Sequence, residues 1–346
     1  MRVLLTGGTG YVGSYTARAL VDAGHRPSLL VRSQARLDAK LTALGVDSDA
    51  VDVVIGDMTD ADAVSAAAAG CDAAIHAAAA VEIFNRGDAE RTVEINVNGT
   101  RNVIDAALAA GCDPVVHVSS IAVFGTTGPP VITTDLPPAT ADGNPYARSK
   151  ALTEAFARGR QAEGRPVVIV YPHGVTGPAA GDQFGELAAG FVSMLKTGCL
   201  VTKGGGLGIV DVRDVAAALV AALQPQRGPR RFTVSGTFVP LPQVGVLIRQ
   251  LTGRRFPVLP IAGSVFRGLG HTTDVVRRVV PFSTVFTAEA RAALTLARPS
   301  DDTAVHDELG VHYRDVTETV AASLTALHAG GLLSARQVGR LATRTA

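Results

Sequence analysis

Seven short apolar runs alternate with longer amphipathic stretches over the first 235 of the chain's 346 residues. The runs are rich in valine and isoleucine and are apolar at consecutive positions, which is typical of strands buried on both faces. They occupy residues 2–6, 27–32, 51–57, 72–78, 114–120, 166–172 and 231–236. Helical patterns lie between them, for example at 11–24, ending at Gly24, and at 88–110, followed by Gly111 as a candidate C-cap. The alternation predicts right-handed βαβ units, and therefore an α/β fold with a doubly wound parallel sheet.

The segment "VLLTGGTGYVG" places Gly7, Gly10 and Gly13 between the first predicted strand and the first predicted helix. Glycines let the backbone turn tightly and approach a pyrophosphate, whose charge meets the free N–H groups at the helix N-terminus. Gly13 would let the helix pack closely on the strand. Because the glycines stand in this strand-to-helix context, they predict a dinucleotide-binding Rossmann domain rather than a generic turn.

The alternation is interrupted in two places. Residues 171–208 and the chain after residue 236 contain Pro- and Gly-marked loops, and amphipathic helices without a strong strand signal follow. No clean linker separates these segments from the rest, so we expect one bipartite globule. The dinucleotide-binding domain is predicted to comprise 1–170 and 209–235. A smaller substrate-binding lobe would comprise 171–208 and 236–346.

The second predicted strand bears on which dinucleotide is bound. An NAD-preferring site usually has an acidic residue at this strand end to take the ribose 2′-OH. Here the segment "SLLVRSQAR" ends the strand with Arg32 and Ser33, and no acid stands there. Arg32 is positioned to grip a 2′-phosphate, which favours NADP(H) over NAD(H). The alternative is a solvated arginine at a strand end.

The next two strand ends carry further candidates. Asp57 ends the third strand, where its carboxylate can accept from an adenine amino group or cap the following turn. The fourth strand ends in "HAAAA", residues 76–80, whose small side chains suit a surface passed closely by a cofactor. His76 is interpreted as a packed or hydrogen-bonded strand residue without a catalytic role.

The next candidate residues are two serines, a tyrosine and a lysine. Ser119 and Ser120 end the fifth strand, and ligands of open α/β sheets bind beyond such carboxyl ends. Tyr146 and Lys150 lie four residues apart, on one face of a helix that is expected to begin near Pro145. A free tyrosine has a pKa of ~10. A tyrosine that acts as an acid or base near neutral pH therefore requires its site to stabilise the phenolate form by roughly 4 kcal/mol. A neighbouring ammonium and an oxidised nicotinamide can supply that stabilisation.

Together, TGGTGYVG, the paired serines, YARSK and "YPHGVTGP" resemble the extended branch of the short-chain dehydrogenase/reductase superfamily, which is NAD-dependent epimerase/dehydratase-like. The pattern is most similar to dihydroflavonol reductase and hydroxysteroid dehydrogenase relatives, firmly over residues 1–215. The resemblance implies that Tyr146 is the general acid/base and that Lys150 lowers its pKa and binds the nicotinamide ribose. It implies that Ser120, rather than Ser119, orients the carbonyl. Asn96 matches a motif position whose role is either bracing a helix or relaying protons.

The resemblance and the strand-end positions together imply a cofactor-binding set. It comprises Gly7, Thr9, Gly10, Tyr11, Val12, Gly13, Arg32, Asp57, Met58, Ala77, Ala78, Ala79, Tyr146, Lys150, Pro172, Gly174 and Val175. His173 is expected to contact the nicotinamide end through its backbone only. Asp214, before the apolar run within 210–223, is expected to be a helix N-cap.

These features favour one reaction class over two alternatives. The leading hypothesis is an NADP-dependent oxidoreductase that interconverts a ketone or aldehyde and an alcohol on a small, largely apolar molecule. No acid follows Ser120, which argues against dehydration, and no Asn stands in the segment 171–174, where nucleotide-sugar enzymes usually have one. The alternatives are an NAD-retaining nucleotide-sugar epimerase and a non-catalytic NAD(P)-sensing regulator.

Composition excludes several partner classes. The net charge of +1 gives no indication of nucleic acid binding, and no run of 18 strongly apolar, uncharged residues indicates a membrane span. The three cysteines form no CxxC pair and indicate reduced thiols without a metal site. We expect a cytoplasmic protein acting on a small molecule. A homodimer through the helices at 88–110 and 145–163 is an expectation from the family resemblance. The motifs are specific to the superfamily and not to one substrate.

Overall fold

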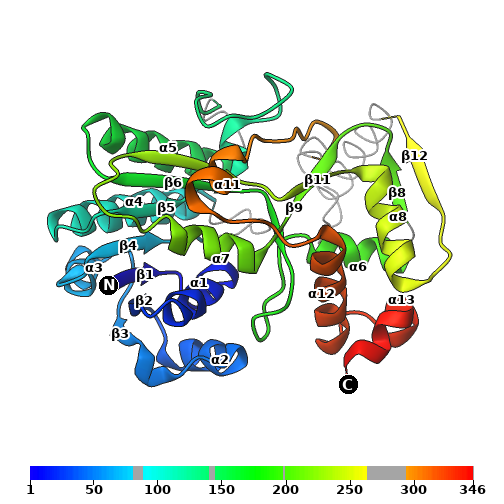
Figure 1. The fold of residues 1–346 in the computed structure, drawn as a ribbon, viewed down its shortest axis with the longest axis horizontal. Coiled ribbons are helices and arrows are strands. Elements are labelled where there is room, and N and C mark those ends of the chain that lie inside the picture. Colours follow the sequence, from blue (N-terminus) through cyan, green and yellow to red (C-terminus); the bar gives the residue numbers. More distant parts are fainter. Residues whose placement is uncertain (81–88, 140–144, 198, 263–293, 346) are drawn as a thin grey trace.

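The computed structural model describes residues 1–80, 89–139, 145–197, 199–262 and 294–345. Its centre is a seven-stranded sheet with the order β10-β6-β5-β4-β1-β2-β3, in which all neighbours are parallel (Figure 1). The strands are β1 (Arg2–Thr6), β2 (Arg26–Val31), β3 (Asp52–Ile55), β4 (Ala73–His76), β5 (Val115–Val118), β6 (Val167–Pro172) and β10 (Arg230–Val234). Each forms within one of the seven apolar runs or starts one residue before it. This confirms the doubly wound parallel sheet.

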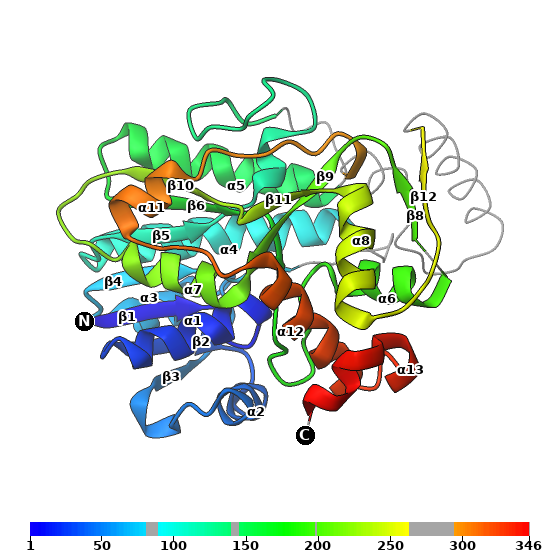
Figure 2. The same cartoon turned by 45° about the vertical axis from the view of Figure 1, so that its right-hand side comes forward.

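Helices cover both faces of the sheet and bury two separate cores against it (Figures 1 and 2). One face carries α1 (Tyr11–Asp22), α2 (Gln34–Leu44), α7 (Val212–Ala221) and α11 (Thr303–Leu309). The other carries α3 (Ala61–Ala68), α4 (Ala89–Ala109) and α5 (Pro145–Ala162). Gly24 and Gly111, just after α1 and α4, have φ of 74° and 84°, the left-handed conformation expected at helix ends.

The strand order reverses direction between β1 and β4. The chain builds outward from β1 through β2 to β3, then returns to place β4 on the other side of β1. The carboxyl ends of β1 and β4 therefore lie on either side of the switch point, where doubly wound sheets bind ligands. The space beyond these strand ends is called the crevice below. Thr6 of β1 pairs with His76 of β4 at this point, and the glycine loop begins directly after Thr6.

A smaller lobe packs beside the carboxyl ends of the sheet and has its own core. Its strands are β7 (Gly174–Thr176), β9 (Gly206–Asp211) and β11 (Thr237–Pro240) in one sheet, and β8 (Cys199–Thr202) and β12 (Val258–Ile261) in another. Its helices are α6 (Ala188–Thr197), α8 (Leu241–Thr252), α12 (Val316–Ala329) and α13 (Ala335–Val338). Short 3-10 turns are η1 (Ser48–Ala50), η2 (Ile121–Phe124) and η3 (Gly339–Thr345).

The stretch directly after residue 236, which the sequence marks as helix and Pro- and Gly-containing loops, also contains two strands, β11 and β12. Both are four-residue strands that contain a proline, Pro240 and Pro260. Proline has no backbone N–H to donate to a neighbouring strand, and it is confined to edge strands and strand ends. A short segment that contains proline is therefore predicted to be a loop. Each pairs with a strand from 199–211, and that long-range pairing gives no local signal.

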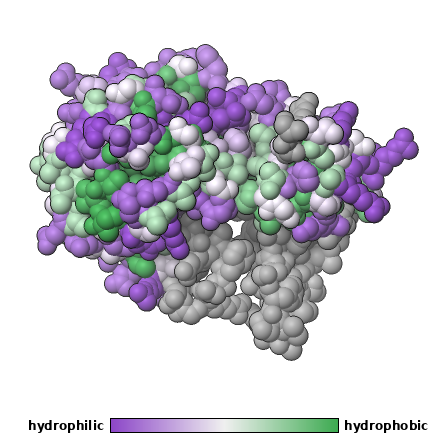
Figure 3. Space-filling model, turned by 90° about the horizontal axis from the view of Figure 1, so that it is seen from below, coloured by the Kyte–Doolittle hydropathy of each residue, from purple (hydrophilic) through white to green (hydrophobic). Residues whose placement is uncertain are grey.

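The return of the chain from the lobe to the sheet completes the first core. In Figures 1 and 2, α11 lies beside α7 and β10, and Val305, Leu309 and Val311 are buried in the same core as α1 and α2. On the face shown in Figure 3, hydrophilic and hydrophobic residues are interspersed. Among the described helices, none has the length and apolar character to cross a bilayer.

Candidate active site

The glycine loop forms a tight cradle at the switch point. Gly7 has φ of 82°, and a Cβ there would lie 2.7 Å from the Ala77 carbonyl carbon. A Cβ on Gly13 would lie 2.1 Å from the Gly7 carbonyl oxygen, so α1 packs against the loop at a distance that only glycine allows. Gly10 is the N-cap of α1 and supplies no side-chain cap. The first turn of α1 therefore has the geometry that accepts an anionic group.

The end of β4 is held against this cradle by a buried hydrogen-bonded chain. His76 Nδ1 lies 2.7 Å from Thr6 Oγ1, and its Nε2 lies 3.0 Å from Thr100 Oγ1 of α4. The Ala78 N–H donates to Thr6 Oγ1 at 3.4 Å. Burial lowers the pKa of His76 to about 3, with the charge of Lys150 acting in the same direction. His76 is thus a neutral, hydrogen-bonded strand residue, as the sequence indicated.

Arg32 and Asp57 stand together where β2 and β3 end. The Arg32 side chain is 77% exposed, and its NH1 lies 3.8 Å from Asp57 Oδ2. Asp57 also accepts from the backbone N–H and the hydroxyl of Thr59, at 2.9 and 2.8 Å. Burial raises the pKa of Asp57, but the Thr59 hydrogen bonds and Arg32 outweigh it and hold that pKa below its usual value. The carboxylate caps the turn after β3, while the guanidinium remains accessible to a ligand.

The turn after β3 is fixed to α4 from the other side. Asn102 Nδ2 donates to the carbonyl oxygens of Met58 and Thr59, each at 3.1 Å. A Cβ on Gly99 would lie 2.6 Å from Met58 Cγ, so the methionine packs directly on the helix backbone. This contact fixes the position of Met58 at the crevice.

The two serines after β5 have different surroundings. Ser119 is buried, and its hydroxyl donates to Glu154 Oε2 at 2.8 Å. The fully buried Glu154 also accepts from Tyr171 Oη and Arg158 Nε, both at 2.6 Å. Ser120 is half-buried, and its Oγ accepts from the Ala122 N–H at 3.2 Å as the N-cap of η2. That cap uses the oxygen of Ser120 and leaves the O–H proton to serve a ligand.

Lys150 lies beneath the end of β5. Helix α5 begins at Pro145, as expected, and Tyr146 is its second residue, although the Tyr146 side chain is outside the described part of the structure. The Lys150 side chain is buried, and its Nζ lies 3.5 Å from the Val118 carbonyl oxygen. Burial lowers the pKa of Lys150, and the carboxylates of Glu186 and Glu154 oppose that shift.

Asn96 braces the site instead of pointing into it. Its Oδ1 accepts from the Ala80 N–H at 2.7 Å, and its Nδ2 donates to the Ala80 carbonyl at 3.0 Å and to Ser149 Oγ at 3.3 Å. The side chain thus joins α4, the segment after β4 and α5. Of the two roles left open by the sequence, this geometry describes the bracing role.

The segment after β6 leads directly into β7 of the smaller lobe. Pro172 ends β6, and Gly174 and Val175 begin β7. A Cβ on Gly174 would lie 2.8 Å from the Gly208 carbonyl oxygen. His173 Nδ1 accepts from the Gly174 N–H at 2.8 Å, and burial lowers the pKa of His173 to about 4, so the ring is neutral.

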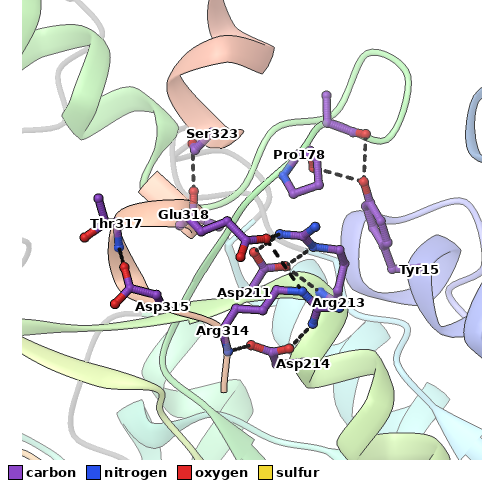
Figure 4. Close-up of polar contacts among 12 residues, drawn as sticks. Tyr15, Pro178, Asp211, Arg213, Asp214, Arg314, Asp315, Thr317, Glu318 and Ser323 are labelled. Atoms are coloured by element: carbon purple, nitrogen blue, oxygen red, sulfur yellow. Dashed lines mark hydrogen bonds and ion pairs between the residues drawn. The ribbon is translucent and has the colours of Figure 1, made fainter. Parts of the chain in front are cut away.

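Ion pairs join the smaller lobe to the sheet domain (Figure 4). Asp211 accepts from the Arg213 backbone N–H at 2.9 Å and from its guanidinium at 2.8 Å, and Arg213 NH2 reaches Glu318 of α12 at 3.0 Å. Asp214 pairs with Arg314. The N-cap of α7 is therefore Asp211, and the expectation for Asp214 is wrong. The helix begins at residue 212, which leaves Asp214 in the first turn, buried against Arg314.

Polar residues near the site that were not singled out from the sequence include His117, Glu154 and Glu186. Glu154 carried a usable signal, because it follows Lys150 by four residues and so lies on the same buried helix face. His117 and Glu186 reach the site through tertiary contacts alone. Among the described residues, no group of three His, Cys, Asp or Glu side chains is arranged to hold a metal ion.

Comparison with known proteins was made against families, sequences and structures. Residues 3–235 match the NAD dependent epimerase/dehydratase family. A dihydroflavonol 4-reductase, itself named putative, from Synechocystis is 30% identical over 239 residues, which is 68% of this chain and 66% of that protein. The human 3 beta-hydroxysteroid dehydrogenase type 7 is 36% identical over 168 residues, which is 46% of each chain. The match therefore spans about half to two thirds of these relatives.

The structural comparison gives the same architecture. A UDP-glucose-4-epimerase from Stenotrophomonas, solved with NAD and a formylated UDP-arabinopyranose, superposes with a TM-score of 0.73 at 20% identity. The superposition covers 96% of this chain and 99% of the epimerase. At this identity the likeness establishes the Rossmann-type fold and the accompanying lobe, and nothing about the reaction.

Proposed function

Because this chain belongs to the NAD dependent epimerase/dehydratase family, we propose that it is an NADP-dependent oxidoreductase. It interconverts a ketone or aldehyde and an alcohol on a small, largely apolar molecule. The proposal rests on the different surroundings of the two serines that follow β5. Ser119 is committed to Glu154, whereas Ser120 keeps its hydroxyl proton at the crevice, with Lys150 beneath the same strand end.

The described residues fit a dinucleotide. The cradle of Gly7, Gly10 and Gly13 has room only for backbone, as a pyrophosphate site requires. The ends of β2 and β3 would receive the adenosine part, with Arg32 toward a 2′-phosphate. Lys150 would hold the nicotinamide ribose. When bound, the nicotinamide supplies hydride transfer at the carbonyl carbon.

The side chains of the protein contribute proton transfer and stabilisation of negative charge to this reaction. In reduction, Tyr146 donates its phenolic proton to the carbonyl oxygen as negative charge develops there, and Ser120 donates a hydrogen bond to the same oxygen. The Lys150 ammonium stabilises the phenolate that Tyr146 becomes. In alcohol oxidation the same groups act in reverse, with phenolate as the base.

The reaction is tested by the variant Tyr146→Phe. NADPH oxidation is followed at 340 nm over a panel of ketones and aldehydes. Loss of a general acid should lower turnover on the order of 10²- to 10⁴-fold while NADPH still binds. Tyr15→Phe is the matched control, since the Tyr15 hydroxyl bonds to the carbonyls of Pro178 and Ala179, away from Lys150. Unchanged turnover in Tyr146→Phe would exclude the mechanism.

The cofactor preference is tested separately by Arg32→Ser. If Arg32 meets a 2′-phosphate, NADPH affinity falls about 10- to 100-fold, or ~1.4 to 2.7 kcal/mol, while NADH affinity is unchanged. Arg18→Ser is the control, because Arg18 is an exposed α1 residue that pairs with Asp22. Fluorescence titration measures both dinucleotides. Tight NAD binding with negligible NADPH affinity in the wild type would instead favour an epimerase.

A further inference from the structure

A small cavity lies beside Lys150 and is also lined by Ala78 and Ala79, which follow β4. It has a volume of about 10 Å³, and its walls include His117 of β5, Thr100 and Asn96 of α4, and Lys150 and Thr153 of α5. That volume accommodates one water molecule, and a buried water requires two or more polar partners. The walls of this cavity are polar enough to provide them.

His117 is the unusual member of this wall. Its side chain is 2% exposed, and neither ring nitrogen has a hydrogen-bond partner within the described parts of the chain. The ring stacks on His76, with centroids 5.5 Å apart and planes 23° from parallel. Stacking satisfies neither nitrogen, and buried polar groups without a partner are costly and rare.

The other polar groups on the wall are already engaged. Thr100 Oγ1 bonds to His76, and Thr153 Oγ1 donates to the Lys150 carbonyl at 3.1 Å. Both N–H groups and the oxygen of the Asn96 amide are used by Ala80 and Ser149. Both nitrogens of the His117 ring lack a partner among the described residues, and a water in the cavity can donate to one of them. An ammonium has three N–H donors, and Lys150 lines the same cavity.

We propose that His117 is a positioning residue: one of its ring nitrogens accepts a hydrogen bond from a single buried water, which in turn accepts one from the Lys150 ammonium. The pair stabilises the charged form of Lys150 and orients it toward Tyr146. The inference rests on the proposed function, because it assigns His117 to the same Tyr–Lys site. It adds a residue from β5 that acts through Lys150 without touching the substrate.

The electrostatic surroundings of Lys150 are compatible with this role. His76 and His117 face it from β4 and β5, Glu154 from its own helix, and Glu186 from the segment before α6. Burial lowers the pKa of both imidazoles, His117 well below its ordinary value. Both rings are therefore neutral near pH 7, so they accept hydrogen bonds without repelling the ammonium.

The test measures the acidity of Tyr146 without any substrate. The phenolate of Tyr146 is titrated by ultraviolet difference absorption in the cofactor-free protein, as the wild-type signal minus that of Tyr146→Phe. Replacing His117 by Leu removes the acceptor, which destabilises the ammonium and should raise the pKa of Tyr146 by half a unit or more. His117→Gln keeps an acceptor and should restore the wild-type value. A folded His117→Leu protein with an unchanged Tyr146 pKa would overturn the proposal.

A second measurement covers the case in which His117→Leu does not fold. A high-resolution crystal structure of the wild type should show a water within hydrogen-bond distance of both a His117 ring nitrogen and Lys150 Nζ. A direct contact between the two side chains, or no water between them, refutes the inference. Failure of the carbonyl panel together with the expected rise of the Tyr146 pKa in His117→Leu would reject the proposed substrate class and leave the role of His117 standing.

Discussion

Ser119 and Ser120 are adjacent, yet one is tied to a buried carboxylate and the other faces the crevice. Consecutive residues leaving a strand point in different directions, so one hydroxyl can stabilise the fold while its neighbour is available for chemistry. The Glu154 network also includes Tyr171 and Arg158, which join α5 to β6. The different environments of the two serines therefore support Ser120, and not Ser119, as the proposed catalytic residue.

This division predicts opposite effects for two alanine variants. Ser120→Ala removes a hydrogen bond to the developing oxyanion and should lower turnover about 10²- to 10³-fold with little change in stability. Ser119→Ala leaves one oxygen of buried Glu154 without its partner and should cost ~1 to 3 kcal/mol of unfolding free energy. Urea unfolding and turnover are measured on both proteins. The reverse pattern would assign the chemistry to Ser119.

At the scale of single elements, the junction of β1 with α1 is the tightest point of the cofactor cradle. Gly13 sits on the Gly7 carbonyl, which fixes the distance between helix and strand. This contact, rather than the composition of the loop, sets the shape of the loop.

Gly13→Ala is the variant that examines this contact. A methyl group 2.1 Å from a carbonyl oxygen forces α1 away from β1. Overpacking of this kind should cost ~1 to 3 kcal/mol and weaken NADPH binding at least tenfold. Gly159→Ala in α5 is the control, since nothing lies within 4 Å of its added Cβ. That change should stabilise the helix by ~0.5 to 1 kcal/mol. Calorimetry and fluorescence titration measure both, and normal NADPH affinity in Gly13→Ala would contradict the cradle.

The sequence predicted the main elements because their signals are local. Runs of Val and Ile gave all seven central strands, and Gly24 and Gly111 marked helix ends. The cap Asp211 is a local contact to the Arg213 N–H, and it was missed because Asp214, three residues later, fits the same N-cap signal. The strands β11 and β12 were missed because their pairing partners are distant in sequence. His117 illustrates the same limit at the site, since nothing in "VHVSS" shows that its ring lacks a partner.

At the scale of the whole molecule, buried histidines connect stability to pH. The folded pKa of His76 is about 3 and that of His173 about 4, both lowered chiefly by burial, and that of His117 is lowered well below its usual range. An unfolded imidazole titrates near ~6.5, so below that pH the unfolded chain binds protons that the folded chain does not. Stability is therefore retained above about pH 6.5 and lost progressively as pH falls toward these folded values.

This linkage predicts a decline in stability as pH falls below about 6.5, the pKa of an unfolded imidazole. Each buried histidine should contribute up to ~1.4 kcal/mol per pH unit below its unfolded pKa. Urea unfolding at a series of pH values gives the slope, and His173→Gln should reduce it by the share of one group. A slope unaffected by that substitution would show that His173 is protonated in the folded protein.

The return of residues 303–313 to the sheet bears on how the chain folds during synthesis. The Thr233 hydroxyl donates to the Asp301 carbonyl 68 residues later, at 2.6 Å, and the Ser235 N–H donates to Asp302 at 2.7 Å. Domains generally fold as units while the ribosome lengthens the chain. A nascent chain ending near residue 235 contains every strand of the central sheet, yet it lacks the segment that covers β10 and α7. The core that contains α1, α2 and α7 is therefore completed only after most of the smaller lobe has been synthesised.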